Sequence, residues 1–156
     1  MMYKNILVAV DGSPTSKLAL HEALRLAKEG AQVRAVNVVE NPLAGYMTLT
    51  MVYSYEVMHG AFLKVSQDIL KGAQKDAENL GHIKLETSLI DLGATADFDI
   101  APALVKAATD FQADLIVIGT HGRRGIKRLF LGSVAENVIR QSLVPVLLIR
   151  DAEKTH

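Results

Sequence analysis

The sequence predicts an α/β protein in which helices pack on both faces of a five-stranded parallel sheet. Three observations lead to this fold class. Short continuous apolar runs alternate with longer segments whose apolar residues recur every three or four positions. Gly, Pro, Asp and Ser residues separate the two kinds of segment. The alternation begins and ends with an apolar run, which gives the order β-α-β-α-β-α-β-α-β and hence parallel strands joined by helical crossovers.

Length and composition favour one globular domain spanning residues 1–156. Apolar residues make up 49% of the 156 residues, which is enough for a single core. The 17 basic and 17 acidic side chains cancel, and this balance disfavours nucleic-acid or membrane-surface binding by bulk charge. The absence of cysteine excludes disulfides and thiolate chemistry. The start of the chain lacks a signal-peptide layout, and no apolar run approaches the roughly 18 residues of a membrane span, so we expect a cytoplasmic protein.

The first quarter of the chain predicts a strand, a helix and a second strand. The first strand runs from Tyr3 to Val10 and stops at Asp11-Gly12. Ser13 is typical of a helix N-cap, Pro14 of the first helical position and Gly30 of a helix end. Between them, the apolar residues that recur at helical spacing are Leu20, Ala23, Leu24 and Ala27. The second strand is predicted over residues 31–39.

The middle of the chain predicts a loop, a long helix and a third strand. The loop covers Asn41 to about Tyr53, and the helix then continues to Gly81. Its inward side is assigned to its apolar residues Phe62, Val65, Ile69, Ala73, Ala77 and Leu80. A half-buried strand over Ile83–Leu92 follows, and Gly93–Phe98 is a loop.

The last third predicts two further helix–strand units. The third helix carries its apolar stripe at Ile100, Leu104, Ala107, Ala108 and Phe111. A buried strand over Ala113–Ile118 runs directly into Gly119. The last helix starts at Ser133, with an inner face at Ala135, Val138, Ile139 and Ser142. Pro145 opens the final strand, Val146–Ile149.

The glycines after the fourth strand form the most informative motif. Gly119, Gly122 and Gly132-Ser133 give the spacing G-x2-G-x9-G-S between a strand end and a helix start. This spacing differs from the P-loop and from the dinucleotide fingerprint G-x-G-x-x-G. Glycines at such a place let the backbone approach a ligand, and N–H groups at the helix start favour an anion.

Two strand ends indicate the same ligand crevice. In a doubly wound, Rossmann-like sheet, ligands bind at the carboxyl ends of the strands, where the strand order reverses. The first and fourth strands are the expected neighbours at that reversal. Asp11-Gly12 ends one of them and the Gly119–Gly132 turn ends the other.

Four segments resemble the universal stress protein family, and the resemblance covers nearly the whole chain. They are Val8–Ser13, Asn37–Glu40, Ala113–Gly122 and Leu131–Glu136. The resemblance implies the sheet order 3-2-1-4-5. It also implies the nucleotide-binding branch of the family, because the complete glycine motif is present.

The nucleoside end of the expected site involves Ala9, Asp11 and Val38. The Asp11 carboxylate can accept hydrogen bonds from two ribose hydroxyls, although an Asp beside Gly12 also suits a turn. Ala9 and Val38 would face the base. The resemblance implies that Val38 offers its backbone N–H and C=O to adenine. The Val38 side chain, considered alone, is typical of a valine in the hydrophobic core.

The phosphate end of the expected site consists of Gly119, His121, Gly122, Arg123, Gly132, Ser133 and Val134. The backbone N–H of His121 is expected to matter more than its imidazole. Gly132 would admit a phosphate closely. Ser133 can cap the helix and donate its hydroxyl, and Val134 adds a backbone N–H.

The segment Arg123–Arg128 carries four cations within six residues. Beside a phosphate site, these charges favour a polyphosphate over a neutral ligand, and one or two of them are expected to touch it. The expected cofactor is therefore ATP, with or without Mg²⁺, ahead of AMP or cyclic AMP. A solvated surface loop is the alternative interpretation. A nucleic-acid patch is disfavoured because Phe130 is the sole aromatic residue nearby.

The sequence offers no catalytic residues and no protein metal site. It contains no carboxylate pair, no His-x-x-x-His pair and no G-x-S-x-G motif, although Asp11 and Asp91 could hold Mg²⁺ through the nucleotide. ATP is therefore expected as a bound signal in a dimeric, nucleotide-dependent regulator of the stress response. The alternatives are a slow ATPase or nucleotide hydrolase in the same crevice, and a nucleotide-independent protein-interaction module.

The last strand predicts a partner. Val144–Ile149 is apolar and would form an exposed edge of the sheet, which proteins normally cover. The resemblance implies a homodimer through this strand, and folding of the tail Arg150–His156 over the edge is the alternative. Regulatory protein partners are expected but cannot be named, and neither nucleic acid nor membrane is expected.

Overall fold

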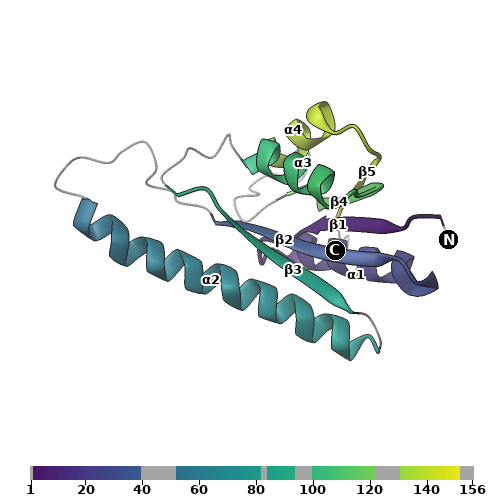
Figure 1. The fold of residues 1–156 in the computed structure, drawn as a ribbon, viewed down its shortest axis with the longest axis horizontal. Coiled ribbons are helices and arrows are strands. Elements are labelled where there is room, and N and C mark those ends of the chain that lie inside the picture. The colour runs from purple at the N-terminus through teal and green to yellow at the C-terminus, as the bar shows by residue number, and fades with distance from the viewer. Residues whose placement is uncertain (1, 40–51, 82–83, 94–99, 122–130, 152–156) are drawn as a thin grey trace, which may run out of the picture.

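A computed structural model describes residues 2–39, 52–81, 84–93, 100–121 and 131–151 (Figure 1). Strands and helices alternate as the sequence predicts, with one short 3-10 helix, η1, after the first helix. Their order is β1 (Asn5–Ala9), α1 (Pro14–Leu26), η1 (Ala27–Glu29), β2 (Gln32–Val39), α2 (Val52–Asn79), β3 (Leu85–Asp91), α3 (Ile100–Asp110), β4 (Leu115–Gly119), α4 (Ser133–Gln141) and β5 (Val146–Ile149).

The five strands form one parallel sheet in the order β3-β2-β1-β4-β5, which confirms the predicted fold class. The chain moves outward from β1 to β3 and then crosses to β4 and β5 on the other side of β1. Helices α1 and α2 cover one face of the sheet, and α3 and α4 cover the other (Figure 1). The strand order therefore reverses between β1 and β4, the place where folds of this kind bind ligands.

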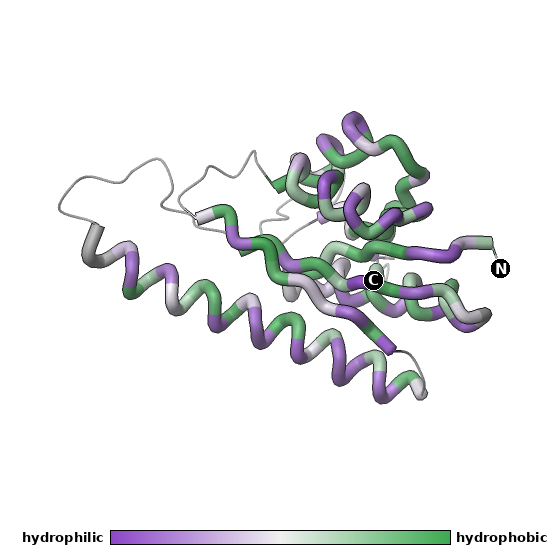
Figure 2. Tube along the Cα trace, in the orientation of Figure 1, coloured by the Kyte–Doolittle hydropathy of each residue, from purple (hydrophilic) through white to green (hydrophobic). Residues whose placement is uncertain are grey.

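The central strand β1 is buried on both sides. Ile6 and Val8 pack into the cluster beneath α1 and α2, while Leu7 packs into the cluster beneath α3 and α4, and all three side chains are 0% exposed. Burial on both faces explains why this strand reads as a continuous apolar run rather than as an alternating pattern. Figure 2 shows the contrast with α2, along which hydrophobic and hydrophilic residues alternate.

Helix α1 begins as the sequence predicts. Ser13 is the N-cap, and its hydroxyl accepts a hydrogen bond from the Ser16 N–H at 3.2 Å. Pro14 occupies the first helical position, where its missing N–H costs nothing. Gly30, with φ at +103°, ends the 3-10 turn that extends the helix.

The inward face of α2 differs from the prediction. The buried residues Ser66, Leu70, Ala73 and Ala77 follow one another at helical spacing, whereas Val65 is 39% exposed and Leu80 is 47% exposed. Ala73 and Ala77 are buried as predicted, but Ser66 and Leu70 complete the inward face in place of Val65 and Leu80. Among the described residues no helix, α2 included, is both long and apolar enough to cross a bilayer.

The predictions for α4 also need two corrections. Gly132 is the N-cap, because its backbone is extended and its carbonyl accepts the Glu136 N–H at 2.9 Å, so Ser133 is the first helical residue. Ala135 and Val138 are buried as predicted, but Ile139 is 42% exposed. A nine-residue helix presents a narrow stripe to the sheet, and Ile139 lies beyond its margin.

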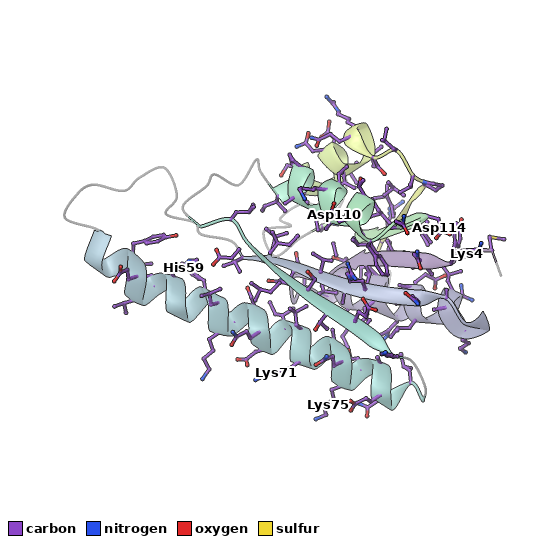
Figure 3. The ribbon with its side chains drawn as sticks, in the orientation of Figure 1. Lys4, His59, Lys71, Lys75, Asp110 and Asp114 are labelled. Carbon is purple, nitrogen blue, oxygen red and sulfur yellow. The ribbon has the colours of Figure 1, made fainter. Side chains whose placement is uncertain are left out.

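The amino end of the sheet is fixed by one carboxylate. Asp114 accepts hydrogen bonds from the backbone N–H groups of Lys4 at 2.8 Å and of Asn5 at 3.0 Å (Figure 3). The Asn5 side chain donates in turn to the Gln112 carbonyl at 3.1 Å. These bonds set the register of β1 against β4 at the edge opposite the candidate site.

Candidate functional site

The carboxyl ends of three neighbouring strands lie side by side where the strand order reverses. β1 lies between β2 and β4, and all three strands are parallel, so their carboxyl ends lie on the same side of the sheet. Ala9 ends β1 and Val38 is the penultimate residue of β2. Both are half-buried and pack against the cluster beneath α3 and α4.

The turn from β1 into α1 is built around Asp11. Its carboxylate accepts the Ser13 N–H at 2.9 Å, and its own N–H donates to the Ser16 hydroxyl at 3.3 Å. Gly12 makes the turn with φ at +82°, a conformation that suits glycine. Asp11 is half-buried and makes a further contact besides these, so its carboxylate is already oriented by the turn.

A hydroxyl on α1 joins this turn to the end of β4. The buried Thr15 side chain donates a hydrogen bond to the His121 carbonyl and lies 3.4 Å from the Ser13 hydroxyl. His121 itself is half-buried, and its Nδ1 lies 3.0 Å from the Thr120 hydroxyl. The loop segment that carries His121 is therefore held against the N-terminus of α1.

Gly119 is required by the packing between α1 and β4. A Cβ atom on this residue would lie 2.9 Å from the Thr15 hydroxyl oxygen and 3.1 Å from the Thr15 carbonyl carbon. Real Cβ atoms essentially never show a contact as short as the first, and the second is tighter than nine in ten real Cβ contacts, so the surroundings would have to shift. The glycine thus lets α1 come close enough for Thr15 to reach His121.

Gly132 is required by the turn that starts α4. Its N–H donates to the Thr120 carbonyl at 2.7 Å, and a Cβ atom on it would lie 3.0 Å from that same oxygen. The Thr120 N–H donates to the Ile149 carbonyl at 2.9 Å, which anchors Thr120 to β5. The start of α4 is consequently fixed to the carboxyl end of the sheet.

The first turn of α4 offers N–H groups at this edge. The first N–H groups of any α-helix lack an acceptor within the helix and carry a partial positive charge. Here they belong to residues that include Ser133, which is exposed, and Val134, which is half-buried. The arrangement can accept an anion from the solvent side.

The end of β1 is tied to β2 by a side chain. The Val10 N–H donates to the Val36 carbonyl at 2.9 Å, and the Asn37 side-chain amide donates to the Val10 carbonyl at 2.7 Å. Asn37 is only 3% exposed. Val10 immediately precedes Asp11, so this pair of bonds also fixes where Asp11 begins its turn.

Asp91 lies at the carboxyl end of β3, on the same side of the sheet as the candidate site. Both of its carboxylate oxygens accept hydrogen bonds. One oxygen lies 2.9 Å from His59 Nε2 on α2 (Figure 3), and the other accepts the Gly93 N–H at 2.8 Å. Tyr55 stacks on the His59 ring with centroids 5.3 Å apart. Asp91 therefore joins α2 to β3, and within the described parts of the chain no three histidine or acidic side chains gather where they could hold a metal ion.

Not all the predicted site residues can be placed. Gly122, Arg123 and the remaining cations up to Arg128 lie outside the described residues. Sequence reasoning missed Thr15 and Asn37. The available signal was a polar residue inside a strand predicted to be buried for Asn37, and a hydroxyl in the first turn of α1 for Thr15.

A concave region lies at the amino ends of the strands, opposite the candidate site. A pocket of about 300 Å³ is lined by Ala27, Lys28, Gly30, Ala31, Gln32, Lys84 and Glu86. Arg34 donates to the Glu86 carboxylate at 2.8 Å and lies 4.1 Å from the centre of the Phe111 ring. The pocket is at the amino ends of β2 and β3, remote from the strand ends that carry the predicted site.

Comparison with known proteins identifies relatives over nearly the full chain. The family model described as "Universal stress protein family" matches residues 2–150. Universal stress protein MJ0531 of Methanocaldococcus jannaschii is 36% identical over 154 residues, which cover 98% of this chain and 85% of that protein.

Two solved structures of similar fold contain nucleotides. The universal stress protein of Archaeoglobus fulgidus in complex with dAMP is 25% identical with a TM-score of 0.66, over 96% of this chain and 99% of the other. A universal stress protein in complex with cAMP is 26% identical with a TM-score of 0.63, over 94% of this chain and 96% of the other. Some structural relatives thus bind adenine nucleotides.

Proposed function

The chain belongs to the universal stress protein family, and on that premise we propose that it is a single ATP-binding domain that acts as a dimeric, nucleotide-dependent regulator of the stress response. ATP would bind at the carboxyl ends of β1, β2 and β4. The nucleotide would serve as a bound signal without fast turnover. Proteins that respond to the nucleotide state would be the downstream partners, in the cytoplasm.

One observation carries this proposal. The Thr15 hydroxyl donates a hydrogen bond to the His121 carbonyl, so the turn with Asp11 lies against the turn that leads to α4. A carboxylate on one side suits ribose hydroxyls, and helix N–H groups on the other side suit phosphate. The dAMP and cAMP of the two solved relatives share an adenine base, a pentose and a phosphate group.

We assign the parts of the nucleotide to residues as follows. Ala9 and Val38 would contact the base, with Val38 using its backbone groups, and Asp11 would accept the ribose hydroxyls. The phosphates would lie against Gly119, His121, Gly122, Arg123, Gly132, Ser133 and Val134. Gly132 would contribute by bringing its turn close to Thr120, because the Cβ direction at Gly132 points to the Thr120 carbonyl.

The triphosphate is preferred over AMP or cyclic AMP on charge. Arg123–Arg128 carries four cations, and a single phosphate would leave most of them unengaged. Mg²⁺ would enter on the phosphate oxygens, as it does in many nucleotide sites that contribute few protein ligands. Asp11 and Asp91, both described and both at the carboxyl ends of strands, are the carboxylates that could hold Mg²⁺ through the nucleotide.

The dimer would form through β5. β5 pairs with β4 alone among the described strands, and its four residues are half-buried. Leu143, which precedes it, is 95% exposed, and Ile139 on α4 is 42% exposed. A second copy of the same edge would cover these apolar groups symmetrically.

A slow ATPase is the second candidate, because it would use the same crevice. Release of labelled γ-phosphate that disappears in Asp11→Asn would favour it over a binding-only regulator. A nucleotide-independent interaction module is the third, and it predicts no nucleotide binding of any kind.

The test is calorimetric titration of the purified chain with ATP, ADP, AMP and cyclic AMP. Two variants remove one contact each and keep the local fold. Asp11→Asn keeps an oxygen for the Ser13 N–H but removes the charge, and Ser133→Ala keeps the first helical residue but removes an exposed hydroxyl. We expect ATP to bind most tightly and each variant to weaken it by about three- to thirtyfold. Unchanged ATP affinity in both variants, or a wild type that binds none of the four, would reject the assigned site.

A further inference from the structure

We propose that Asn37 is a positioning residue whose side-chain amide occupies the Val10 carbonyl and thereby leaves the Val38 N–H available for the adenine base. The inference deepens the proposed function and rests on it, because the base is the ligand that Val38 would serve. Asn37 lies in the segment Asn37–Glu40 that resembles the family.

The pairing of β1 with β2 shows what Asn37 replaces. Ala9 pairs with Val36, and the Val10 N–H donates to the Val36 carbonyl at 2.9 Å. In a regular parallel ladder, the next bond along would run from the Val38 N–H to the Val10 carbonyl. The donor at that carbonyl is instead Asn37 Nδ2 at 2.7 Å. The backbone bonds of the described residues include none from Val38 to Val10.

The following ladder bond is missing as well. A continued ladder would carry the Gly12 N–H to the Val38 carbonyl. The chain has already turned there, with Gly12 at φ +82° and the Asp11 N–H bonded to the Ser16 hydroxyl. Within the described residues, neither backbone group of Val38 has a partner on the β1 side. A donor and an acceptor of the same residue thus point past the end of β1.

The cost of Asn37 indicates that it does not serve stability alone. It is 3% exposed, and its Oδ1 atom is buried without a hydrogen-bond partner. The amide cannot simply be reversed, because Oδ1 would then face the Val10 carbonyl oxygen. An apolar side chain of the same shape would avoid the unpaired acceptor and let the ladder close through Val38. Asn37 therefore keeps the ladder open at the place where a base would dock.

The chemistry of the open groups matches the Watson–Crick edge of adenine. Adenine N1 accepts a hydrogen bond and its N6 amine donates one, which suits a backbone N–H and C=O side by side. Inosine carries a proton on N1, so the Val38 N–H would meet a second donor. Purine riboside keeps the N1 acceptor but lacks the amine. Binding of the triphosphates of adenosine, inosine and purine riboside therefore separates the role of the Val38 N–H from that of the Val38 carbonyl.

The structural half of the inference can be measured without nucleotide. The through-hydrogen-bond scalar coupling between the Val38 amide nitrogen and the Val10 carbonyl carbon should be absent in the wild type. It should appear in Asn37→Leu, a shape-matched variant that cannot donate to Val10. Detection of this coupling in the wild type would overturn the inference, whether or not the variant folds.

The functional half is measured by titration with ATP, ITP and purine riboside triphosphate. The wild type should bind ATP and purine riboside triphosphate more tightly than ITP, and Asn37→Leu should reduce the preference for ATP over ITP by about three- to tenfold. Val33→Ala is the control, since Val33 lies on the same strand and packs into the core at its other end. A destabilised control should keep the wild-type preference, because loss of stability alone does not alter which base is chosen.

The outcomes distinguish this inference from the function on which it rests. A wild type that binds ATP, with the same preference over ITP in Asn37→Leu, would overturn the role of Asn37 and leave the ATP site standing. A wild type that binds none of the three triphosphates would contradict the proposed function, and the inferred purpose of Asn37 would fail with it.

Discussion

Thr15 and His121, 106 positions apart in the sequence, are joined by a hydrogen bond from the Thr15 hydroxyl to the His121 carbonyl. This bond links the N-terminus of α1 to the turn beyond β4. It can form because Gly119 has no side chain in the path of Thr15. The geometry of the candidate site thus depends on a contact between two turns as much as on the residues expected to touch the ligand.

Removal of the Thr15 hydroxyl should weaken both the fold and the site. Thr15→Val keeps the shape of the side chain but leaves the His121 carbonyl without its donor, so we expect unfolding free energy to fall by about 1 kcal/mol and ATP affinity to fall as well. Thr109→Val is the matched control, because Thr109 donates to the Val105 carbonyl at 3.1 Å on the exposed side of α3. Denaturant unfolding and calorimetry measure the two effects. Equal ATP affinity in the two variants would show that this bond does not support the site.

Two glycines should respond to alanine with opposite signs. Gly119→Ala places a methyl group within 3.1 Å of Thr15 backbone, and we expect a loss of about 1–3 kcal/mol in unfolding free energy. Gly72→Ala in α2 meets no atom within 4 Å, and helix propensity predicts a gain of about 0.5–1 kcal/mol. Thermal and urea unfolding of both variants test the pair. A Gly119→Ala protein as stable as the wild type would show that α1 does not pack this closely on β4.

The carboxylate at the amino end of the sheet should affect stability but not ligand binding. Asp114→Ala removes the acceptor for two backbone N–H groups, and the expected loss is about 1–3 kcal/mol. Asp110→Ala breaks an exposed ion pair with Lys106 and should change stability by less than about 0.5 kcal/mol (Figure 3). ATP titration should give the same affinity for both. A selective loss of ATP binding in Asp114→Ala would mean that the amino ends of the strands are coupled to the ligand site at their carboxyl ends.

A proline on the outer side of β5 should separate the proposed dimer. The Pro145 and Ile149 carbonyls accept N–H groups from the β4 side, so the backbone groups of Leu148 point to the free edge. Leu148→Pro removes the outward N–H and spares the bonds to β4. Leu148→Ala loses the same side-chain packing but keeps the N–H. Sedimentation velocity should find a dimer for the wild type and Leu148→Ala and a monomer for Leu148→Pro, and a dimer in all three would exclude pairing through β5.

Much of the fold could be predicted from the sequence because most helices and strands are identified by the residues of their own segment. Burial on both faces makes β1 and β4 continuous apolar runs, and Ser13-Pro14 marks the start of α1 without reference to the rest of the chain. The order of the strands in the sheet cannot be read from any single segment, and its prediction rests on the family resemblance.

The errors arise where contact between distant elements decides the outcome. Ser66 faces the sheet and Val65 does not, because the approach of α2 to β2 and β3 selects the helix face. Ser133 was expected to cap α4, but the bond from Gly132 to Thr120 fixes the cap one residue earlier. Asn37 is a polar residue in a buried strand, and its purpose becomes visible only when the end of β1 is placed beside it.

The most direct test of the ATP site is a map of backbone amide shifts in isotopically labelled protein during titration with MgATP. The proposal predicts shifts at Asp11, Val38 and Gly132–Val134, with none around Lys84 and Glu86 at the opposite edge. Saturable shifts confined to the carboxyl ends of β1, β2 and β4 would establish the assigned crevice. No shifts at all, or shifts centred on the pocket at the amino ends of β2 and β3, would contradict it.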